Sequence, residues 1–339
     1  MGYRIEEVGR AETEVWQECA EFLAHFVASG EQEDPSEADA QPETWSQRFR
    51  WWWAENPFVR DDSPLALVLR QEGGTIVGFH GFIPRDYECE GTVSPGLAAT
   101  TFFVREAHRG ASLGVFMRVQ KLGKTHHIVD TTPSPEMQVI LQKFRYQKHG
   151  EGRTDSIFVF PSSSFGLFLQ PLRWFQAIPG DFPEGDLVTQ VEAVSEVGRP
   201  ANPGIRRQVT KESLLWALRC GLYPKRFYGW LGEDGKLLAW VIAEERKKAK
   251  QGILRVIDHE CVDGSAMRAL LHRLVSRPRV PGLPPHIVGM VWTSLDGDVL
   301  PGKTPVRLNR PQPYYYQLPA SSPNRPRICR LGEGDETLL

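Results

Sequence analysis

Apolar residues at the start of the chain follow first the period of a strand and then that of a helix. Residues 3–8 alternate between apolar and polar side chains, which predicts a strand. Residues 12–26 place Val15, Cys19 and Phe22 at helical spacing, which predicts a helix with one apolar side. The chain therefore begins with a strand followed by a helix.

The same two periodicities continue through the first half of the chain. A second helix is predicted from Thr44, and Asn56-Pro57 ends it. Two glycines in 72–74 separate apolar stretches and predict a hairpin turn. Strands are predicted at 65–71, 76–82, 85–92, 97–104, 126–130 and 156–160, and further helices at 113–122 and 135–144. This mixture predicts an α/β (α+β) fold, with a sheet covered by helices.

The second half of the chain predicts a similar succession of strands and helices. Residues 211–219 predict a helix, and 232–235 predict a hairpin turn that resembles the turn at 72–74. Further strands are predicted at 253–261, 287–293 and 314–318, and a helix at 265–276. At 339 residues the chain is long enough for two domains. We expect an N-terminal domain (1–160), a connection rich in Ser, Pro and Gly (161–207), a C-terminal internal repeat (208–318) and a loose tail (319–339).

Composition excludes several classes of function. Hydrophobic residues make up 41% of the chain and charged residues 24%, as in soluble globular proteins. A net charge of −2 provides no overall positive field that would attract a phosphate backbone, which argues against a nucleic-acid partner. No apolar run reaches the roughly 20 residues of a membrane helix. The N-terminus does not resemble a signal sequence, so we expect a cytoplasmic protein without a membrane partner.

The cysteines and histidines do not predict a metal site. The five cysteines are widely scattered without a C-x-x-C pair, which predicts reduced thiols. His126 and His127 are adjacent but have no cysteine or carboxylate partner at ligand spacing. We therefore expect no metal ion.

The most informative stretch is 102–117, where an apolar strand runs through a turn into an amphipathic helix. The turn contains Arg109, Gly110, Ser112 and Gly114. Small residues let backbone N–H groups converge, and a helix N-terminus adds partial positive charge, so the stretch predicts a cradle for a phosphate or pyrophosphate. Its spacing matches neither the P-loop of nucleotide hydrolases nor the dinucleotide fingerprint.

This stretch resembles the GNAT family of acyl-CoA-dependent N-acyltransferases, whose signature is a strand, then [QR]-x-x-G-x-[GA], then a helix. The match is at Arg109 and Gly114, with Ser112 in place of the middle glycine. Residues 140–146 are similar to the second signature of the family, a helix that ends in L-Y-x-K-x-G-F. The resemblance covers 3–160 and extends weakly to 210–318. It implies two GNAT-like mixed-sheet domains flanked by helices, with a degenerate C-terminal copy.

The resemblance also implies a substrate and a set of binding residues. The substrates would be acetyl-CoA, or another acyl-CoA, and a small-molecule amine that attacks the acyl carbon directly. Strand residues would hydrogen-bond the pantetheine arm, and the turn would hold the pyrophosphate. The residues that match binding positions are Phe103, Val104, Arg109, Gly110, Ala111, Ser112, Leu113, Gly114 and Ser134.

The catalytic assignment departs from the family pattern. The helix position that usually carries a tyrosine, the general acid for the leaving thiolate, is Leu141, and the glycine before Tyr146 is replaced by Arg145. We expect Tyr146 itself to lie in the core. The candidate general bases are Glu106, Glu88, Asp86, His80, His127 and Asp130, of which Asp130, Glu106 and His80 are favoured.

Two further features bear on the acceptor and on alternatives. Six acidic residues within 31–43 predict a loop that would attract a cationic amine. Residues 262–268 stand where a second cradle would be and lack its small residues. A Fem-like or carrier-protein-dependent acyl or aminoacyl transferase, and a non-catalytic acyl-CoA-binding module, therefore remain open beside the N-acyltransferase.

Overall fold

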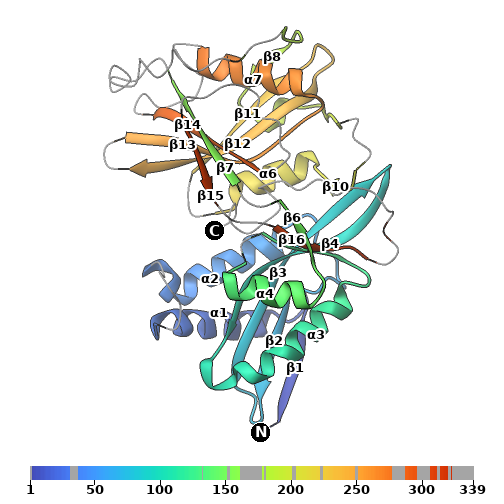
Figure 1. Ribbon diagram of the computed structural model, residues 1–339, viewed down its shortest axis with the longest axis vertical. Helices are drawn as coiled ribbons and strands as arrows, with labels where there is room; N and C mark the ends of the chain where they lie inside the picture. The colour runs from blue at the N-terminus through green and yellow to red at the C-terminus, as the bar shows by residue number, and fades with distance from the viewer. Residues whose placement is uncertain are drawn as a thin grey trace.

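Two mixed β-sheets with helices on both faces make up the described part of the protein (Figure 1). The computed structural model describes residues 2–30, 37–131, 133–150, 153–160, 178, 181–200, 204–221, 224–248, 251–276, 287–295, 306–310, 314–319 and 322. The sheet that holds the N-terminus lies at the bottom of the view, and the second sheet lies above it. The predicted α/β (α+β) class is confirmed.

The first sheet combines an antiparallel part with one parallel pair. Neighbouring strands are antiparallel except for β4 and β5, which are parallel. In spatial order the strands are β1 (Tyr3–Val8), β2 (Ala66–Gln71), β3 (Ile76–Cys89), β4 (Thr92–Val104), β5 (His127–Asp130), β16 (Tyr314–Gln317) and β6 (Gln147–His149). A parallel pair needs a crossover, and the helix between β4 and β5 provides it.

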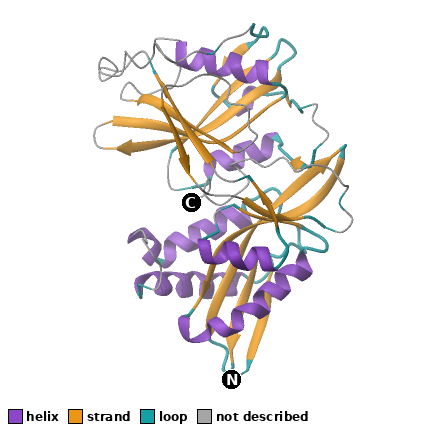
Figure 2. Ribbon diagram, viewed as in Figure 1, coloured by secondary structure: helices purple, strands orange, loops and turns teal. Residues whose placement is uncertain are grey.

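Helices cover both faces of this sheet (Figure 2). Phe79 and Ile83 of β3 face one cluster, and Phe82 of the same strand faces the other, as alternation along a strand requires. The first face carries α1 (Thr13–Ala28), η1 (Glu37–Ala40), α2 (Pro42–Phe49) and η2 (Arg50–Ala54), and the second carries η3 (Glu106–Ala111), α3 (Ser112–Leu122) and α4 (Pro135–Lys143).

The second sheet has a similar plan. Its strands in spatial order are β8 (Asp186–Val188), β11 (Lys225–Leu231), β12 (Lys236–Lys248), β13 (Gln251–Cys261), β14 (Ile287–Leu295), β7 (Arg153–Val159) and β15 (Val306–Arg310). β9 (Glu196–Val197) also pairs with β12, and η4 (Val191–Ala193) lies between β8 and β9 in the chain. Only β13 and β14 are parallel within the main order, and α7 (Gly264–Ser276) connects them. α6 (Lys211–Arg219) packs on the opposite face from α7.

The two sheets exchange strands, which the sequence did not predict. The segment expected to close the first domain, 156–160, lies largely in β7, which pairs with β14 and β15 of the second sheet. The segment expected in the C-terminal repeat, 314–318, forms β16, which pairs with β5 and β6 of the first sheet. Both predictions of sheet membership were wrong, because period-2 alternation identifies a strand but not its partner.

A second correction concerns β3, which is one strand where two were predicted, at 76–82 and 85–92. Phe82 donates its N–H to Leu65 at the edge shared with β2, so the nitrogen of Pro84, two residues on, faces the same edge. The pairing of β2 with β3 does not extend as far as Pro84. On the same edge, β10 (Arg206–Arg207) pairs with β3 only at Tyr87 and Glu88. The missing N–H therefore removes no ladder bond.

The second domain meets the first through α6. The Trp216 indole of α6 donates a 2.7 Å hydrogen bond to the Trp51 carbonyl and packs in the same core cluster. The four neighbouring tryptophans at 45, 51, 52 and 53 are all buried, although at least one was expected to be exposed or at an interface. Trp51 meets the second of these conditions, because its backbone contacts α6.

The remaining predicted elements of the first domain occur in the predicted order, and most of their ends shift by one or two residues, but β4 begins at Thr92 where the prediction was 97. Of the acidic loop, 31–36 lie outside the described residues, whereas Glu37–Ala40 form a short 3₁₀ helix. Most of 161–180 and of the predicted tail also lie outside the described part. Among the helices that the structure describes, none is long and apolar enough to cross a membrane.

Candidate active site

The parallel strands β4 and β5 separate after a short common ladder. They pair only from Gly96 to Ala98 on β4 and from His127 to Val129 on β5. Within the described residues, the rest of β4, up to Val104, has a strand partner on one edge alone, β3. Backbone N–H and C=O groups on the other edge need partners from elsewhere, so this edge can accept an extended ligand.

Thr101 forms a β-bulge at the start of this unpaired stretch. His80 pairs with Phe102 and Gly81 pairs with Thr100, so Thr101 has no partner in the register. Its φ is +48°, a conformation that costs a β-branched residue about 1–3 kcal/mol. Bulges commonly lie next to active sites, where they redirect a strand. The strained residue thus lies just beyond Ala98, the last residue of β4 that pairs with β5.

Beyond β4 the chain enters η3 and then α3, where the cradle was predicted. Arg109 and Gly110 are exposed. The Ser112 hydroxyl and backbone N–H both donate to the Arg109 carbonyl, the hydroxyl at 2.7 Å, so these two donors are already engaged. Anion binding would therefore depend on the other exposed amides and on the Arg109 side chain.

The two glycines of the turn have different surroundings. A Cβ placed on Gly110 would meet no atom within 4 Å, so the space above it is open. A Cβ on Gly114 would lie 3.0 Å from the Ile5 side chain of β1. Gly114 thus permits close packing of α3 on the sheet, whereas Gly110 leaves room for a ligand to approach the backbone. Leu113 projects from the same turn and is exposed.

The start of α4 places Ser134 beside the predicted site. Its hydroxyl caps the helix, accepting from the Met137 N–H at 3.2 Å and donating to the Glu136 carboxylate at 2.9 Å. Pro135 occupies the first helical turn, where its missing N–H is harmless. The Ser134 side chain is therefore committed to the helix cap.

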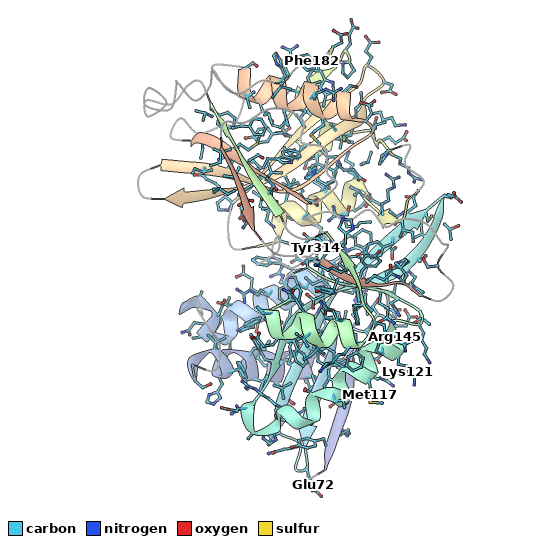
Figure 3. All side chains as sticks on the ribbon, viewed as in Figure 1. Glu72, Met117, Lys121, Arg145, Phe182 and Tyr314 are labelled. Atoms are coloured by element: carbon cyan, nitrogen blue, oxygen red, sulfur yellow. The ribbon has the colours of Figure 1, made fainter. Side chains whose placement is uncertain are left out.

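α4 ends at Lys143 and is followed by a left-handed turn. Leu141 is buried in the core on the α3 and α4 face and has no proton to donate. Arg145 has a φ of +61°, the left-handed conformation that favours glycine. The Tyr146 N–H donates to the Leu141 carbonyl and the Arg145 N–H to the Gln142 carbonyl, each at 3.0 Å. Figure 3 labels Arg145 beside Met117 and Lys121 of α3.

His80 lies next to the bulge, inside an aromatic environment. Its ring is 5.1 Å from that of Phe102 and 4.9 Å from that of Phe82, and Phe116 of α3 packs nearby. Its buried Nδ1 has no hydrogen-bond partner among the residues that the structure describes. Burial lowers the pKa of His80 to about 3, so the imidazole is neutral at neutral pH and accepts a proton poorly.

Asp130 and Glu106 occupy different surroundings. Asp130 ends β5, half-buried, and together with burial it raises the pKa of Tyr146. Tyr146 lies in the core, as expected. Glu106 is exposed at the first position of η3. The strand order places His80 and Asp130 on the two strands that flank β4.

Three other candidate bases have structural partners. Asp86 accepts two hydrogen bonds from Arg60, and Glu88 accepts one from Arg199. His127 is buried against Tyr87, with their ring centres 4.9 Å apart. These residues lie along β3 and β5 before the strands separate, away from the bulge.

The opposite face of β4 carries aromatic side chains. Phe103 stacks on Phe26 of α1 with ring centres 4.6 Å apart, and the Arg105 guanidinium lies 5.6 Å from the centre of the Phe22 ring. An amine that approaches the bulge from the α1 side would meet this surface.

Sequence reasoning missed Tyr315 of β16. Its hydroxyl accepts a 2.8 Å hydrogen bond from Gln142, the residue after Leu141, and its ring is fully buried in the same cluster as Leu141. No sequence pattern connects residues so far apart in the chain. The positive φ of Thr101 was equally inaccessible, because threonine gives no signal for it.

Comparisons with known proteins identify the fold. Three of the solved structures that match most of the chain at TM-scores above 0.5 illustrate the similarity. They are a probable N-acyltransferase from Enterococcus faecalis (TM-score 0.56, 12% identity, 93% of this chain and 72% of that one), a GCN5-related N-acetyltransferase from Anabaena variabilis (0.55, 12%, 93% and 72%) and Eis1 from Mycobacterium abscessus (0.52, 15%, 94% and 73%). The chain therefore has a GNAT-like fold. No family model and no curated protein matches the chain.

Proposed function

We propose that the protein is an acyl-CoA-dependent N-acyltransferase whose active site is the unpaired edge of β4. The observation that carries this proposal is the Thr101 bulge, where β4 leaves β5 and continues into the turn before α3. A free strand edge suits the amide groups of a pantetheine arm, and the exposed turn at Arg109 and Gly110 suits a pyrophosphate. The similar fold of N-acetyltransferases supports the same function.

The chemistry requires two proton transfers. The amine nitrogen forms a bond to the acyl carbon while the carbon–sulfur bond breaks, the amine loses a proton to a base, and the thiolate gains one. The backbone N–H of Val104 would stabilise the negative charge that develops on the carbonyl oxygen, because it faces the free edge whereas the next N–H, that of Arg105, donates to Val77 of β3. We propose Asp130, Glu106 and His80 as candidate bases, with Asp130 first because the pKa of His80 is only about 3.

We also propose that the second half is a degenerate copy of the first. Both sheets have a parallel pair bridged by one helix, and both have a register shift in the hairpin before it. In the second sheet Ile242 pairs with Asp258 and Ala243 with Val256, so Ile257 is skipped as Thr101 is in the first. At the turn before α7, the Asp263 carboxylate accepts from the Ser265 and Ala266 N–H groups, which leaves this turn poorly suited to a phosphate.

The acceptor is proposed to be a small amine, of cationic character. The described part of the acidic loop supports this through Glu43, which is exposed in the first turn of α2, beside α1, whereas Asp39 is already paired with Arg48. Cations are attracted to such a surface over distances of about 10 Å at moderate ionic strength. A panel of amines that differ in charge would test this preference.

Titration calorimetry with acetyl-CoA and longer acyl-CoAs, followed by a thiol-release assay with an amine panel, tests the function. The Arg109→Ala variant is expected to bind acyl-CoA about tenfold more weakly, because a charge-assisted contact to phosphate is lost. Lys124→Ala, an exposed cation in the turn after α3, is the matched control and is expected to bind normally. Absence of acyl-CoA binding by the unmodified protein would contradict the proposal.

The buried Leu141 in the proton-donor position favours a second candidate, a non-catalytic acyl-CoA-binding module. This candidate predicts acyl-CoA binding without release of free thiol for any amine. A Fem-like or carrier-protein-dependent transferase instead predicts that the unmodified protein has no affinity for free acyl-CoA. Arg109→Ala would then leave the calorimetric signal with acyl-CoA unchanged. The two measurements therefore separate all three functions.

A further inference from the structure

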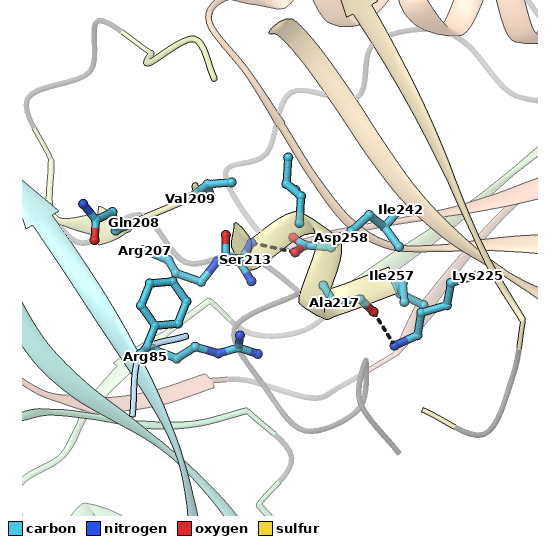
Figure 4. Close-up of a pocket in the computed structure, with 12 residues that line it drawn as sticks. Arg85, Arg207, Gln208, Val209, Ser213, Ala217, Lys225, Ile242, Ile257 and Asp258 are labelled. Atoms are coloured by element: carbon cyan, nitrogen blue, oxygen red, sulfur yellow. Dashed lines mark hydrogen bonds and ion pairs between the residues drawn. The ribbon is translucent and has the colours of Figure 1, made fainter. Parts of the chain in front are cut away.

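A small cavity of about 20 Å³ lies where the two domains meet, away from the β4 edge (Figure 4). Two strands of the first sheet, β3 and β10, and four elements of the second domain, α6, β11, β12 and β13, contribute to its wall. The charged residues that line it are Arg85 of β3, Arg207 of β10, Lys225 of β11 and Asp258 of β13, with Ser213 of α6 between them. Three of these four charges are positive.

Arg85 is the unusual member of this group. Its side chain is 3% exposed, and its guanidinium carbon lies 4.5 Å from the centre of the Trp216 ring. No carboxylate among the described residues lies within ion-pairing distance of Arg85, and its buried Nε has no hydrogen-bond partner. Burial and then the neighbouring Arg207 lower the pKa of Arg85 to about 10, while Asp258, which lies beyond ion-pairing distance, offsets part of this effect, so Arg85 remains charged at neutral pH. A buried charge without a counter-charge is strongly unfavourable.

The nearby acids are already engaged with other cations. Asp258 accepts a 2.6 Å hydrogen bond from Arg207 in a buried ion pair. Lys225 donates to the Ala217 carbonyl at 3.1 Å and lies opposite Glu244 in the pairing of β11 with β12. Asp86, next to Arg85 in the chain, is bound by Arg60. The residues that the structure describes thus leave Arg85 as an excess positive charge at the cavity.

Arg48 shows how the same chain accommodates a buried arginine elsewhere. It is also 3% exposed and also lies 4.5 Å from the centre of a tryptophan ring, that of Trp45. The difference is that Arg48 forms an ion pair with Asp39 at 2.5 Å. The comparison isolates what Arg85 lacks, which is an anion.

We propose that this cavity binds one small inorganic anion of about the size of chloride, held by Arg85 together with the positive ends of Arg207 and Lys225. A cavity of about 20 Å³ has room for at least one water-sized sphere, and a monatomic anion is the simplest occupant of that size. Because Arg85 belongs to the first sheet and Lys225 and Asp258 belong to the second domain, the bound anion joins the two domains.

Thermal unfolding of the full chain tests this directly. The melting temperature is measured at constant ionic strength while sodium chloride replaces sodium gluconate, whose anion is too large for the cavity. Above the dissociation constant, each tenfold increase in chloride is expected to raise the melting temperature by about 2–4 °C, because only the folded protein binds. Equal melting temperatures in the two salts would mean that the cavity holds water alone, and the proposal would be wrong.

Two variants assign the effect to the cavity. Arg85→Met keeps the length of the side chain against Trp216 and removes the charge, so its melting temperature is expected not to depend on chloride. Arg48→Met is the matched control: it is expected to lower the melting temperature and to keep the full dependence on chloride. A chloride dependence that survives in Arg85→Met would overturn the assignment.

A further measurement does not depend on any variant that could fail to fold. Crystals of the unmodified protein grown in bromide are expected to show an anomalous-scattering peak within hydrogen-bond distance of the Arg85 guanidinium. Bromide peaks at the surface alone, with none in this cavity, would contradict the proposal.

Discussion

Tyr315 of β16 lies directly opposite Asp130 of β5 in the antiparallel pairing of the first sheet. The hydroxyl of this fully buried tyrosine accepts a hydrogen bond from Gln142 of α4. A strand from the far end of the chain thus completes the part of the sheet beneath α4, where Leu141 replaces the tyrosine expected from the family resemblance. The exchange of strands between the domains brings a phenol to this region.

From this relationship we predict that Tyr315 supplies the proton to the leaving thiolate. In Tyr315→Phe, kcat is expected to fall about 100-fold while the KM for acyl-CoA stays unchanged, as for loss of a general acid. Steady-state kinetics over a range of pH measure this effect. Tyr316→Phe, on the neighbouring residue of β16, which packs in a different cluster, is the control. If Tyr315 only holds Gln142, the variant will keep its kcat and lose about 1 kcal/mol of stability.

Thr101 provides a second prediction. Deleting it removes the extra residue of the bulge, so β4 can pair with β3 without a register shift and loses the local bend that directs the strand next to the site. We expect the deletion variant to lose acyl-CoA binding, whereas Thr101→Gly, which accepts the positive φ without strain, keeps it. Calorimetric binding and circular dichroism of both variants measure the outcome. Normal binding by a folded deletion variant would show that the bulge does not form the site.

The sequence could predict the local elements and the turn that precedes α3, because both have local signals. Apolar spacing located α1 and α3, and the Arg109 to Gly114 stretch indicated the place of the cradle. Strand partners depend on contacts between distant residues, so β7 and β16 were assigned to the wrong sheets. The same reason hid Tyr315. The position of His80 in the sequence made it a reasonable candidate base. Its burial among Phe82, Phe102 and Phe116 depends on the fold and could not be predicted from the sequence.

The end of α4 gives a prediction about stability. Arg145 occupies the left-handed position of a helix-terminating motif at a φ of +61°. Replacing it with glycine relieves backbone strain, and the greater flexibility of glycine in the unfolded chain offsets part of the gain. We expect Arg145→Gly to raise the free energy of unfolding by up to about 1 kcal/mol. Urea unfolding measures the change, and a clear loss of stability would mean that the Arg145 side chain makes a compensating contact.

The buried histidine gives a prediction about pH. Burial lowers the pKa of His80 from 6.5 to about 3, so between these values the unfolded chain binds a proton that the folded protein does not. Stability contributed by neutral His80 is therefore complete above pH 6.5 and is lost as the pH falls towards 3, by about 1.4 kcal/mol per pH unit. Urea unfolding between pH 7 and pH 5 measures this slope.

Substitution of His80 by leucine, which does not titrate, should remove this part of the pH dependence. His80→Leu is chosen because the ring is surrounded by aromatic side chains and its buried Nδ1 has no hydrogen-bond partner, so an apolar side chain of similar size loses little. The variant is expected to show a shallower fall in the free energy of unfolding between pH 7 and pH 5 than the unmodified protein. His108, whose ring is partly exposed and contacts Tyr3, provides the control in His108→Leu, which is expected to keep the original slope. Identical slopes for the unmodified protein and His80→Leu would contradict the depressed pKa of His80.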